Sequence, residues 1–151
     1  MRPLFPLATA LIAPALLLAA CNGRSTSSTI ETRNPVVRLA AAPGGPAAGY
    51  LTLSASKDHV ALTAISSPKA AKVEMHETMS SGSMSSMRPL SRIDVRYGEI
   101  VFAPGGRHLM LFGVDPALKP GDHIPLVLVF SNGGVAAVSA RVIGPGEEVP
   151  D

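Results

Sequence analysis

Turn-forming residues interrupt this chain so often that no long helix fits between them. The 151 residues include 14 Gly and 14 Pro, and clusters at 43–46, 104–106, 119–122 and 131–134 separate short apolar runs. No window of a dozen residues keeps a 3.6-residue period, whereas several runs alternate apolar and polar residues as half-buried strands do. The pattern predicts an all-β domain, a Greek-key β-sandwich or small barrel of about eight or nine short strands.

The expected strands are drawn from short runs at 36–40, 49–55, 60–65, 72–76, 87–90, 93–97, 99–103, 107–114, 124–130 and 135–143. The run 124–130 is nearly all apolar, so we expect a central strand that is covered on both sides. The segment 78–86 is rich in Ser and Met and too polar for a core, which indicates a flexible loop. Residues 117–118 are expected to form one short turn of helix.

The N-terminus has the pattern of an export signal. Arg2 precedes an uncharged apolar stretch from about residue 4 to residue 20. Residues 18–21, Leu-Ala-Ala-Cys, resemble the lipobox of bacterial lipoproteins, which implies cleavage before Cys21 and acylation of Cys21. Asn22 stands where an Asp would favour inner-membrane retention, so an outer-membrane anchor is expected. The alternative is an ordinary secretory signal followed by a chance cysteine.

Composition divides the chain into four parts. Residues 1–20 form the signal, and residues 21–34 form the lipidated cysteine with a polar, Ser/Thr-rich flexible tether. The folded domain is expected over residues 35–143, which is long enough for a modest core of its own. Residues 144–151 form a C-terminal tail rich in Pro, Gly and Glu.

Charge and motif content exclude several classes of function. The formal net charge is +2 without a run of Lys or Arg, so nucleic-acid binding is not expected. A single cysteine excludes an internal disulfide bond and a CxxC pair. No GxSxG or HExxH motif occurs, so we do not expect an enzyme.

Soft metal ligands are concentrated in one part of the chain. Five of the six methionines lie within 36 residues, together with two of the four histidines. Thioether sulfur and imidazole nitrogen are donors that suit Cu(I), whereas Mg²⁺ and Ca²⁺ prefer oxygen. His108 and Met110 are two residues apart on an expected strand and therefore share one face. The cluster comprises Met75, His76, Met79, Met84, Met87, His108 and Met110.

The spacing of these residues resembles that of PCuAC-type periplasmic copper chaperones. The family motif is a His, a Met about eleven residues later, and a His-x-Met about twenty-one residues after that. His76, Met87, His108 and Met110 match it, and so do the flanking segments 73–77, 87–90, 104–111 and 118–122. The resemblance covers about residues 36–142. It departs from the family in the lipobox, since many members are free periplasmic proteins.

The resemblance implies a cupredoxin-like barrel that binds one Cu(I) through His76, Met87, His108 and Met110. It further implies delivery of copper to an acceptor such as the CuA subunit of cytochrome c oxidase or a Sco-type protein. A periplasmic copper-buffering lipoprotein without a dedicated acceptor remains the alternative. An electron-transfer cupredoxin would need a cysteine ligand inside the domain, and Cys21 lies outside it.

The remaining residues of the cluster have more than one interpretation. Met75 alternates with Val73 toward the core, so we expect a packing role. Met79 and Met84 are candidate auxiliary ligands that capture or hand over copper. Glu77 is either a partner that orients the His76 ring or a solvated side chain. His59 and His123 are expected at the surface.

Overall fold

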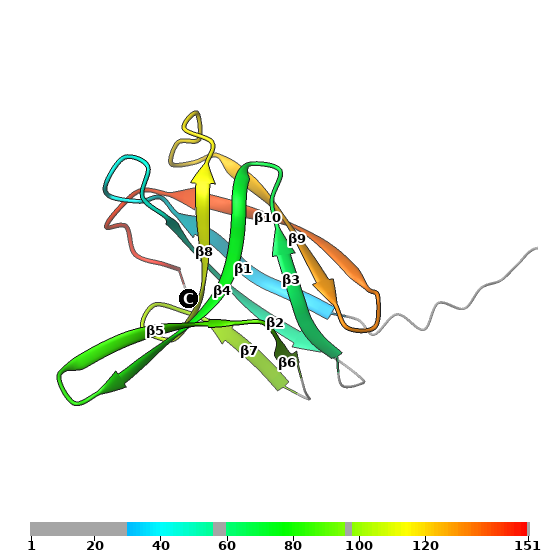
Figure 1. Ribbon diagram of the computed structural model, residues 1–151. Coiled ribbons are helices and arrows are strands. Elements are labelled where there is room, and N and C mark those ends of the chain that lie inside the picture. Colours follow the sequence, from blue (N-terminus) through cyan, green and yellow to red (C-terminus); the bar gives the residue numbers. More distant parts are fainter. Residues whose placement is uncertain (1–29, 56–59, 96–97, 151) are drawn as a thin grey trace, which may run out of the picture.

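The computed structural model describes residues 30–55, 60–95 and 98–150, and within these ranges it contains only strands and turns (Figure 1). The all-β expectation is confirmed, with ten strands instead of eight or nine. No helix in the described part of the chain is long and apolar enough to cross a membrane. The strands are β1 (Ile30–Arg38), β2 (Ala47–Ala55), β3 (Val60–Ser66), β4 (Ala70–Ser81), β5 (Met84–Leu90), β6 (Ile93–Val95), β7 (Gly98–Phe102), β8 (Arg107–Val114), β9 (His123–Phe130) and β10 (Val135–Ile143).

The strands hydrogen-bond in the order β5-β4-β8-β7-β2-β1-β10-β9-β3-β6. Most neighbours are antiparallel, and β1–β10 and β7–β8 are parallel pairs. Strand β2 pairs with β8 through its first residues and with β7 through its last residues. This switch lets the sheet fold over, so that β3 and β9 face β2, β4 and β8 across one core.

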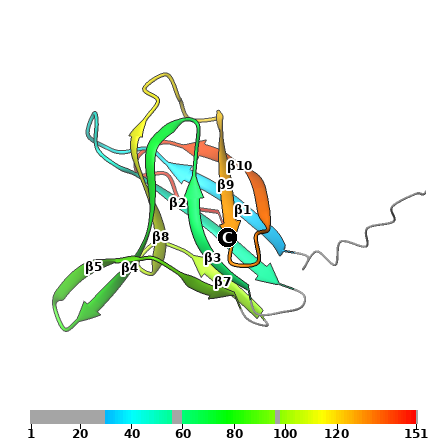
Figure 2. The same cartoon turned by 45° about the vertical axis from the view of Figure 1, so that its right-hand side comes forward.

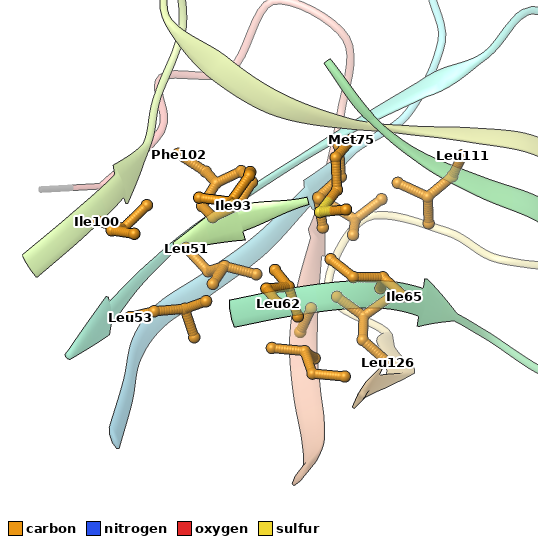
Figure 3. Packing of buried hydrophobic residues seen from close by; sticks show 14 of the residues in the cluster. Leu51, Leu53, Leu62, Ile65, Met75, Ile93, Ile100, Phe102, Leu111 and Leu126 are labelled. Carbon is orange, nitrogen blue, oxygen red and sulfur yellow. The ribbon is translucent and has the colours of Figure 1, made fainter. Parts of the chain in front are cut away.

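The core is aliphatic because the chain has no Trp and only four Phe. Side chains from both halves of the sheet point toward one another in Figure 3, with Leu62 and Leu126 on one side and Leu51, Met75 and Leu111 on the other. Strand alternation supplies these residues, since every second side chain of a strand faces inward. The expected core role of Met75 is confirmed.

Strand β9 was expected to be buried on both faces, and the structure buries only one of them. It lies inside the sheet, between β10 and β3, as predicted. However, Ile124, Leu126 and Leu128 are buried while the alternate residues Pro125 and Val127 are exposed or half-buried. The prediction of cover on both sides was wrong, because a folded-over antiparallel sheet buries only its inner face.

Strand β1 begins earlier than the expected domain. It starts at Ile30 and pairs with β2 from Ile30↔Ala55 onward, with a bulge between Arg33 and Val36. Asn34, at the bulge, has a left-handed φ of 48°. Residues 30–34 therefore belong to the sheet and not to a tether, and the expected signal, Cys21 and residues 22–29 lie outside the described residues.

Two further segments expected to be irregular or helical are different in the structure. Residues 117–118 form a turn in which the Asp115 carboxylate accepts a hydrogen bond from the Ala117 amide, and not a turn of helix. The segment 78–86, expected as a flexible loop, is the tip of the β4–β5 hairpin. Its two-residue turn has Gly82 at φ 62°, a conformation that tight hairpins need. Figures 1 and 2 both show this hairpin extending away from the body.

Candidate metal centre

Strand register brings the two clustered histidines together. In the antiparallel pair β4–β8, His76 lies opposite His108, and Glu74 lies opposite Met110. Side chains of opposed residues project from the same face of a sheet. His76, His108 and Met110 therefore share one face, and the neighbouring residues Met75 and Leu109 point from the other face into the core.

Met87 joins the same face from the third strand. In the pair β4–β5 it lies opposite Thr78, which is two residues beyond His76 on β4. The four residues predicted as ligands, His76, Met87, His108 and Met110, thus project from one side of β5-β4-β8, which we call the outer face. Met87 is 58% exposed, because the hairpin carries it beyond the body of the domain.

The two imidazoles have the separation that a shared ion requires. Their ring centres are 6.0 Å apart and their planes differ by 31°. Metal–imidazole bonds are about 2.0–2.1 Å, so one ion held by two imidazoles places the ring centres about 5–6.5 Å apart. Both rings are largely withdrawn from solvent, since His108 is 8% exposed and the His76 side chain 13%.

Hydrogen bonds leave each imidazole with one nitrogen free of a protein partner. The Nδ1 atom of His108 lies 3.0 Å from the Gly106 carbonyl oxygen, and a carbonyl oxygen can only accept. The Nε2 atom of His76 lies 2.9 Å from Oε2 of Glu74. The Nδ1 atom of His76 is buried and has no hydrogen-bond partner. A buried polar atom of this kind is rare in folded proteins unless water or a ligand satisfies it.

Glu74 is a residue of the site that the sequence interpretation missed. Its carboxylate also pairs with Lys72, and the hydrogen bonds from Lys72 and then from His76 lower the pKa of Glu74 below its ordinary value. Its position could have been inferred from the sequence, because residues two apart on a strand, such as Glu74 and His76, lie on the same face. Glu77 was considered as the ring partner instead, because it is next to His76 in the sequence.

Glu77 lies on the opposite face and does not contact the His76 ring. Its carboxylate accepts a hydrogen bond of 2.8 Å from Arg88 and lies 3.4 Å from Nε of Arg107. The hydrogen bond from Arg88 lowers the pKa of Glu77 below its ordinary value. Of the two interpretations offered for Glu77, ring orientation is therefore wrong, and the side chain is neither a ring partner nor merely solvated.

The ion pairs of Glu77 connect β4 to β5 and β8, the three strands that carry the outer-face residues. Glu77 follows His76 in the chain, Arg88 follows Met87, and Arg107 precedes His108. Each exposed ion pair contributes little free energy by itself. Their joint effect is on register, because Glu77 on β4 links to both β5 and β8 directly behind the outer face.

Met79 and Met84 are not brought to the four outer-face residues. Met79 lies opposite Ser86, and Met84 lies opposite Ser81, so alternation directs both side chains to the face opposite Met87. They are 50% and 75% exposed. The hairpin thus carries thioethers on both faces, with Met87 alone on the side of the histidines.

The described ranges offer no competing metal site built from His, Cys, Asp or Glu. Residues 30–55, 60–95 and 98–150 hold no group of three or more His, Cys, Asp or Glu placed to bind a metal ion. A hollow of about 520 Å³ lined by Arg38, Tyr50, Pro104 and Glu148 includes none of the four outer-face residues. His123 is exposed, as expected, and His59 lies outside the described residues.

The solved structures with a similar fold include PCuAC domains. They include the copper-bound PCuAC domain from PmoF2, with a TM-score of 0.64 and 22% identity over 77% of this chain and 93% of that one. The Cu(I) form of DR1885 from Deinococcus radiodurans has a TM-score of 0.62 and 24% identity over 80% of each chain. At these identities the likeness establishes a common fold, and the cupredoxin-like expectation is confirmed.

Sequence comparison points to lipoproteins. The chain is 32% identical to the putative lipoprotein Lxx21020 of Leifsonia xyli subsp. xyli over 78 residues, which are 50% of this chain and 47% of that protein. The chain therefore matches about half the length of this curated relative. The family model described as "Putative lipoprotein LpqE-like" matches residues 30–142, which begin at the first residue of β1. The fold is thus that of PCuAC domains, and the chain belongs to the LpqE-like family of putative lipoproteins.

Proposed function

We propose that this protein binds one Cu(I) ion on the outer face, through His76, Met87, His108 and Met110, and passes it to a copper acceptor. The observation that carries the proposal is the register of β5-β4-β8, which gathers two imidazoles and two thioethers on one face. These neutral, soft donors suit Cu(I). Two structural relatives, the copper-bound PCuAC domain from PmoF2 and the Cu(I) form of DR1885, support the same cargo.

The exposure of the four ligands suits a protein that must release its ion. His76 and His108 are largely buried and held by hydrogen bonds, whereas Met87 is exposed on a projecting hairpin. An acceptor that approaches the hairpin can displace the Met87 thioether first, while both imidazoles keep the ion. Met79 and Met84, on the other face, are proposed to capture copper transiently before it reaches the site.

The acceptor is proposed to be a copper protein of the same compartment, such as the CuA subunit of cytochrome c oxidase or a Sco-type protein. The lipobox residues support an anchor at Cys21 on the periplasmic side of a membrane. Residues 22–29 then link the anchor to Ile30, and eight residues span at most about 28 Å. This short reach confines delivery to acceptors close to the anchoring membrane.

Copper buffering is the second candidate function, and Asn22 is the observation that favours it. This residue argues against retention in the inner membrane, where an oxidase would lie. From the outer membrane, a link of about 28 Å does not reach an inner-membrane acceptor. In that case the same site stores copper or hands it to a soluble carrier.

Anaerobic titration of Cu(I) against a competing chelator tests the site. We expect one ion per chain, with two nitrogen and two sulfur scatterers in X-ray absorption. His108→Ala and Met87→Leu should both weaken binding, because each leaves an incomplete set of ligands. Met79→Leu is the matched control for Met87→Leu, since both methionines are exposed on the same hairpin but on opposite faces. It should leave the equilibrium affinity unchanged, because transient capture affects only the rate at which the site is loaded. Equal affinities of these two variants would contradict the assignment of Met87.

Metal transfer separates the chaperone from the buffer. The Cu(I)-loaded protein is mixed with a copper-free soluble CuA domain, and the metal is followed by mass spectrometry. If the protein is a chaperone, the acceptor should gain copper faster from the loaded protein than from a Cu(I)–chelator complex of equal concentration. If no copper is transferred and the protein fractionates with the outer membrane, the hypothesis of oxidase assembly is refuted and copper buffering remains.

A further inference from the structure

The two histidines of the outer face have opposite hydrogen-bonding patterns. His108 uses Nδ1 toward the Gly106 carbonyl at 3.0 Å, whereas His76 uses Nε2 toward the Glu74 carboxylate at 2.9 Å. The other nitrogen of His76, Nδ1, is buried without a hydrogen-bond partner. The difference matters because a neutral imidazole has one N–H and one lone pair, and only the lone pair can bind a metal.

The partners decide which nitrogen carries the proton. A carbonyl oxygen and an ionised carboxylate accept hydrogen bonds and donate none. The proton of His108 therefore belongs on Nδ1, which leaves the lone pair on Nε2. The proton of His76 belongs on Nε2, which leaves the lone pair on the buried Nδ1.

We propose that Glu74 is a positioning residue that fixes the His76 tautomer, so that His76 offers Nδ1 and His108 offers Nε2 to the ion. The effect on copper binding rests on the proposed function, whereas the tautomer of His76 is a property of the metal-free protein. Metal-ligating histidines generally donate their second N–H to a carboxylate or a carbonyl oxygen. Here one histidine has each kind of partner.

The strand keeps Glu74 in place for this role. It lies two residues before His76 on β4 and opposite Met110 on β8, so its side chain starts from the same face as the ligands. Lys72, two residues earlier again, pairs with the other carboxylate oxygen, Oε1. The carboxylate is thus held between Lys72 and His76, and the orientation of the ring follows from it. The competing arrangement has Nε2 of His76 as the ligand, with Glu74 displaced when copper binds.

The test reads the tautomers directly. Long-range ¹H–¹⁵N NMR of the metal-free mature chain, recorded at pH 8, distinguishes Nδ1–H from Nε2–H histidines. We expect His76 as Nε2–H and His108 as Nδ1–H. Glu74→Ala should abolish the preference of His76, and Glu74→Gln, which keeps an acceptor oxygen, should preserve it. Glu99→Ala is the control, because Glu99 is a strand carboxylate on β7 whose ion-pair partner is Arg33; it should leave both tautomers unchanged.

Copper affinity supplies the second readout. Loss of such a hydrogen-bond partner typically weakens metal binding by about 10- to 100-fold, so Glu74→Ala should show a loss of this size and Glu74→Gln a smaller one. An Nδ1–H tautomer of His76 in the wild-type protein would overturn the inference. A loss of affinity in Glu74→Ala without any change of tautomer would overturn it as well. Absence of copper binding by the wild-type protein would refute the proposed function instead, and the NMR result would still stand.

Discussion

The contact between β2 and β8 is tight enough to make one small substitution informative. Gly49 lies opposite Leu109 in this pair. A Cβ atom added to Gly49 would lie 3.0 Å from Cβ of Leu109 and 3.2 Å from Cδ1 of both Leu109 and Leu111. Carbon atoms pack best at about 3.5–4.0 Å. Both leucines are fully buried, so β2 and β8 must separate by a few tenths of an ångström in Gly49→Ala.

The expected change in the free energy of unfolding follows from two opposing effects. Overpacking of a well-packed core costs about 1–3 kcal/mol. Replacing Gly by Ala restricts the unfolded chain and offsets about 0.4–1 kcal/mol of that cost. The net destabilisation of Gly49→Ala is therefore between about 0 and 2.6 kcal/mol, with a central value of about 1.3 kcal/mol. Urea unfolding followed by far-ultraviolet circular dichroism measures it.

Gly106→Ala is the control for this prediction. Its added Cβ would meet only the Ala103 carbonyl oxygen, at an ordinary 3.7 Å. This variant should be as stable as the wild type, or more stable by up to about 1 kcal/mol. If Gly49→Ala proved as stable as Gly106→Ala, the argument for close packing of β2 against β8 would be refuted.

Three further predictions concern the core, the ion pairs and the anchor. Met75→Leu should keep full Cu(I) affinity and lose less than about 1.5 kcal/mol of stability, because Met75 packs in the core and the swap conserves volume; a large loss of affinity in the chelator titration would contradict this. The lowered pKa of Glu77 means that its pairing with Arg88 stabilises the fold above the ordinary carboxyl pKa of 4.5, and that this stabilisation disappears as the pH falls through the lowered value. The difference in Tm between wild type and Glu77→Gln should therefore be largest near neutral pH and vanish in acid; a constant difference from pH 7 to pH 3 would refute it. Cys21→Ser should prevent lipid attachment and partition into detergent, and finding unmodified Cys21 in the mature wild-type protein would overturn the lipoprotein assignment.

Most of the fold was predictable because local sequence rules decide it. Pro and Gly clusters end the strands, and alternation within each strand selects the inward residues. Met75 and His76 show how far this reaches, since adjacent residues of one strand were assigned correctly to the core and to the outer face. The resemblance of the His76, Met87, His108 and Met110 spacing to a family motif selected four residues that the register places on one face; their binding of copper stays a prediction.

Some predictions failed where hydrogen bonding between strands, and not side-chain burial, defines the structure. The first half of β1 and the tip of the β4–β5 hairpin are mostly polar and largely exposed, so their composition resembles that of linkers. Both are strands because a partner strand satisfies their backbone amides and carbonyls. A single sequence contains no record of that partner.

The sequence by itself determined which residues are available for chemistry and on which side of its own strand each one lies. Only the tertiary structure decided which strands are neighbours and in what register. That decision places His76 opposite His108, Glu74 opposite Met110, and Met87 opposite Thr78, so that residues of three strands meet on one face. The physical reason is that strand alternation is a property of the local backbone, whereas register depends on the burial of all inward faces together and on cross-strand hydrogen bonds between residues far apart in the chain.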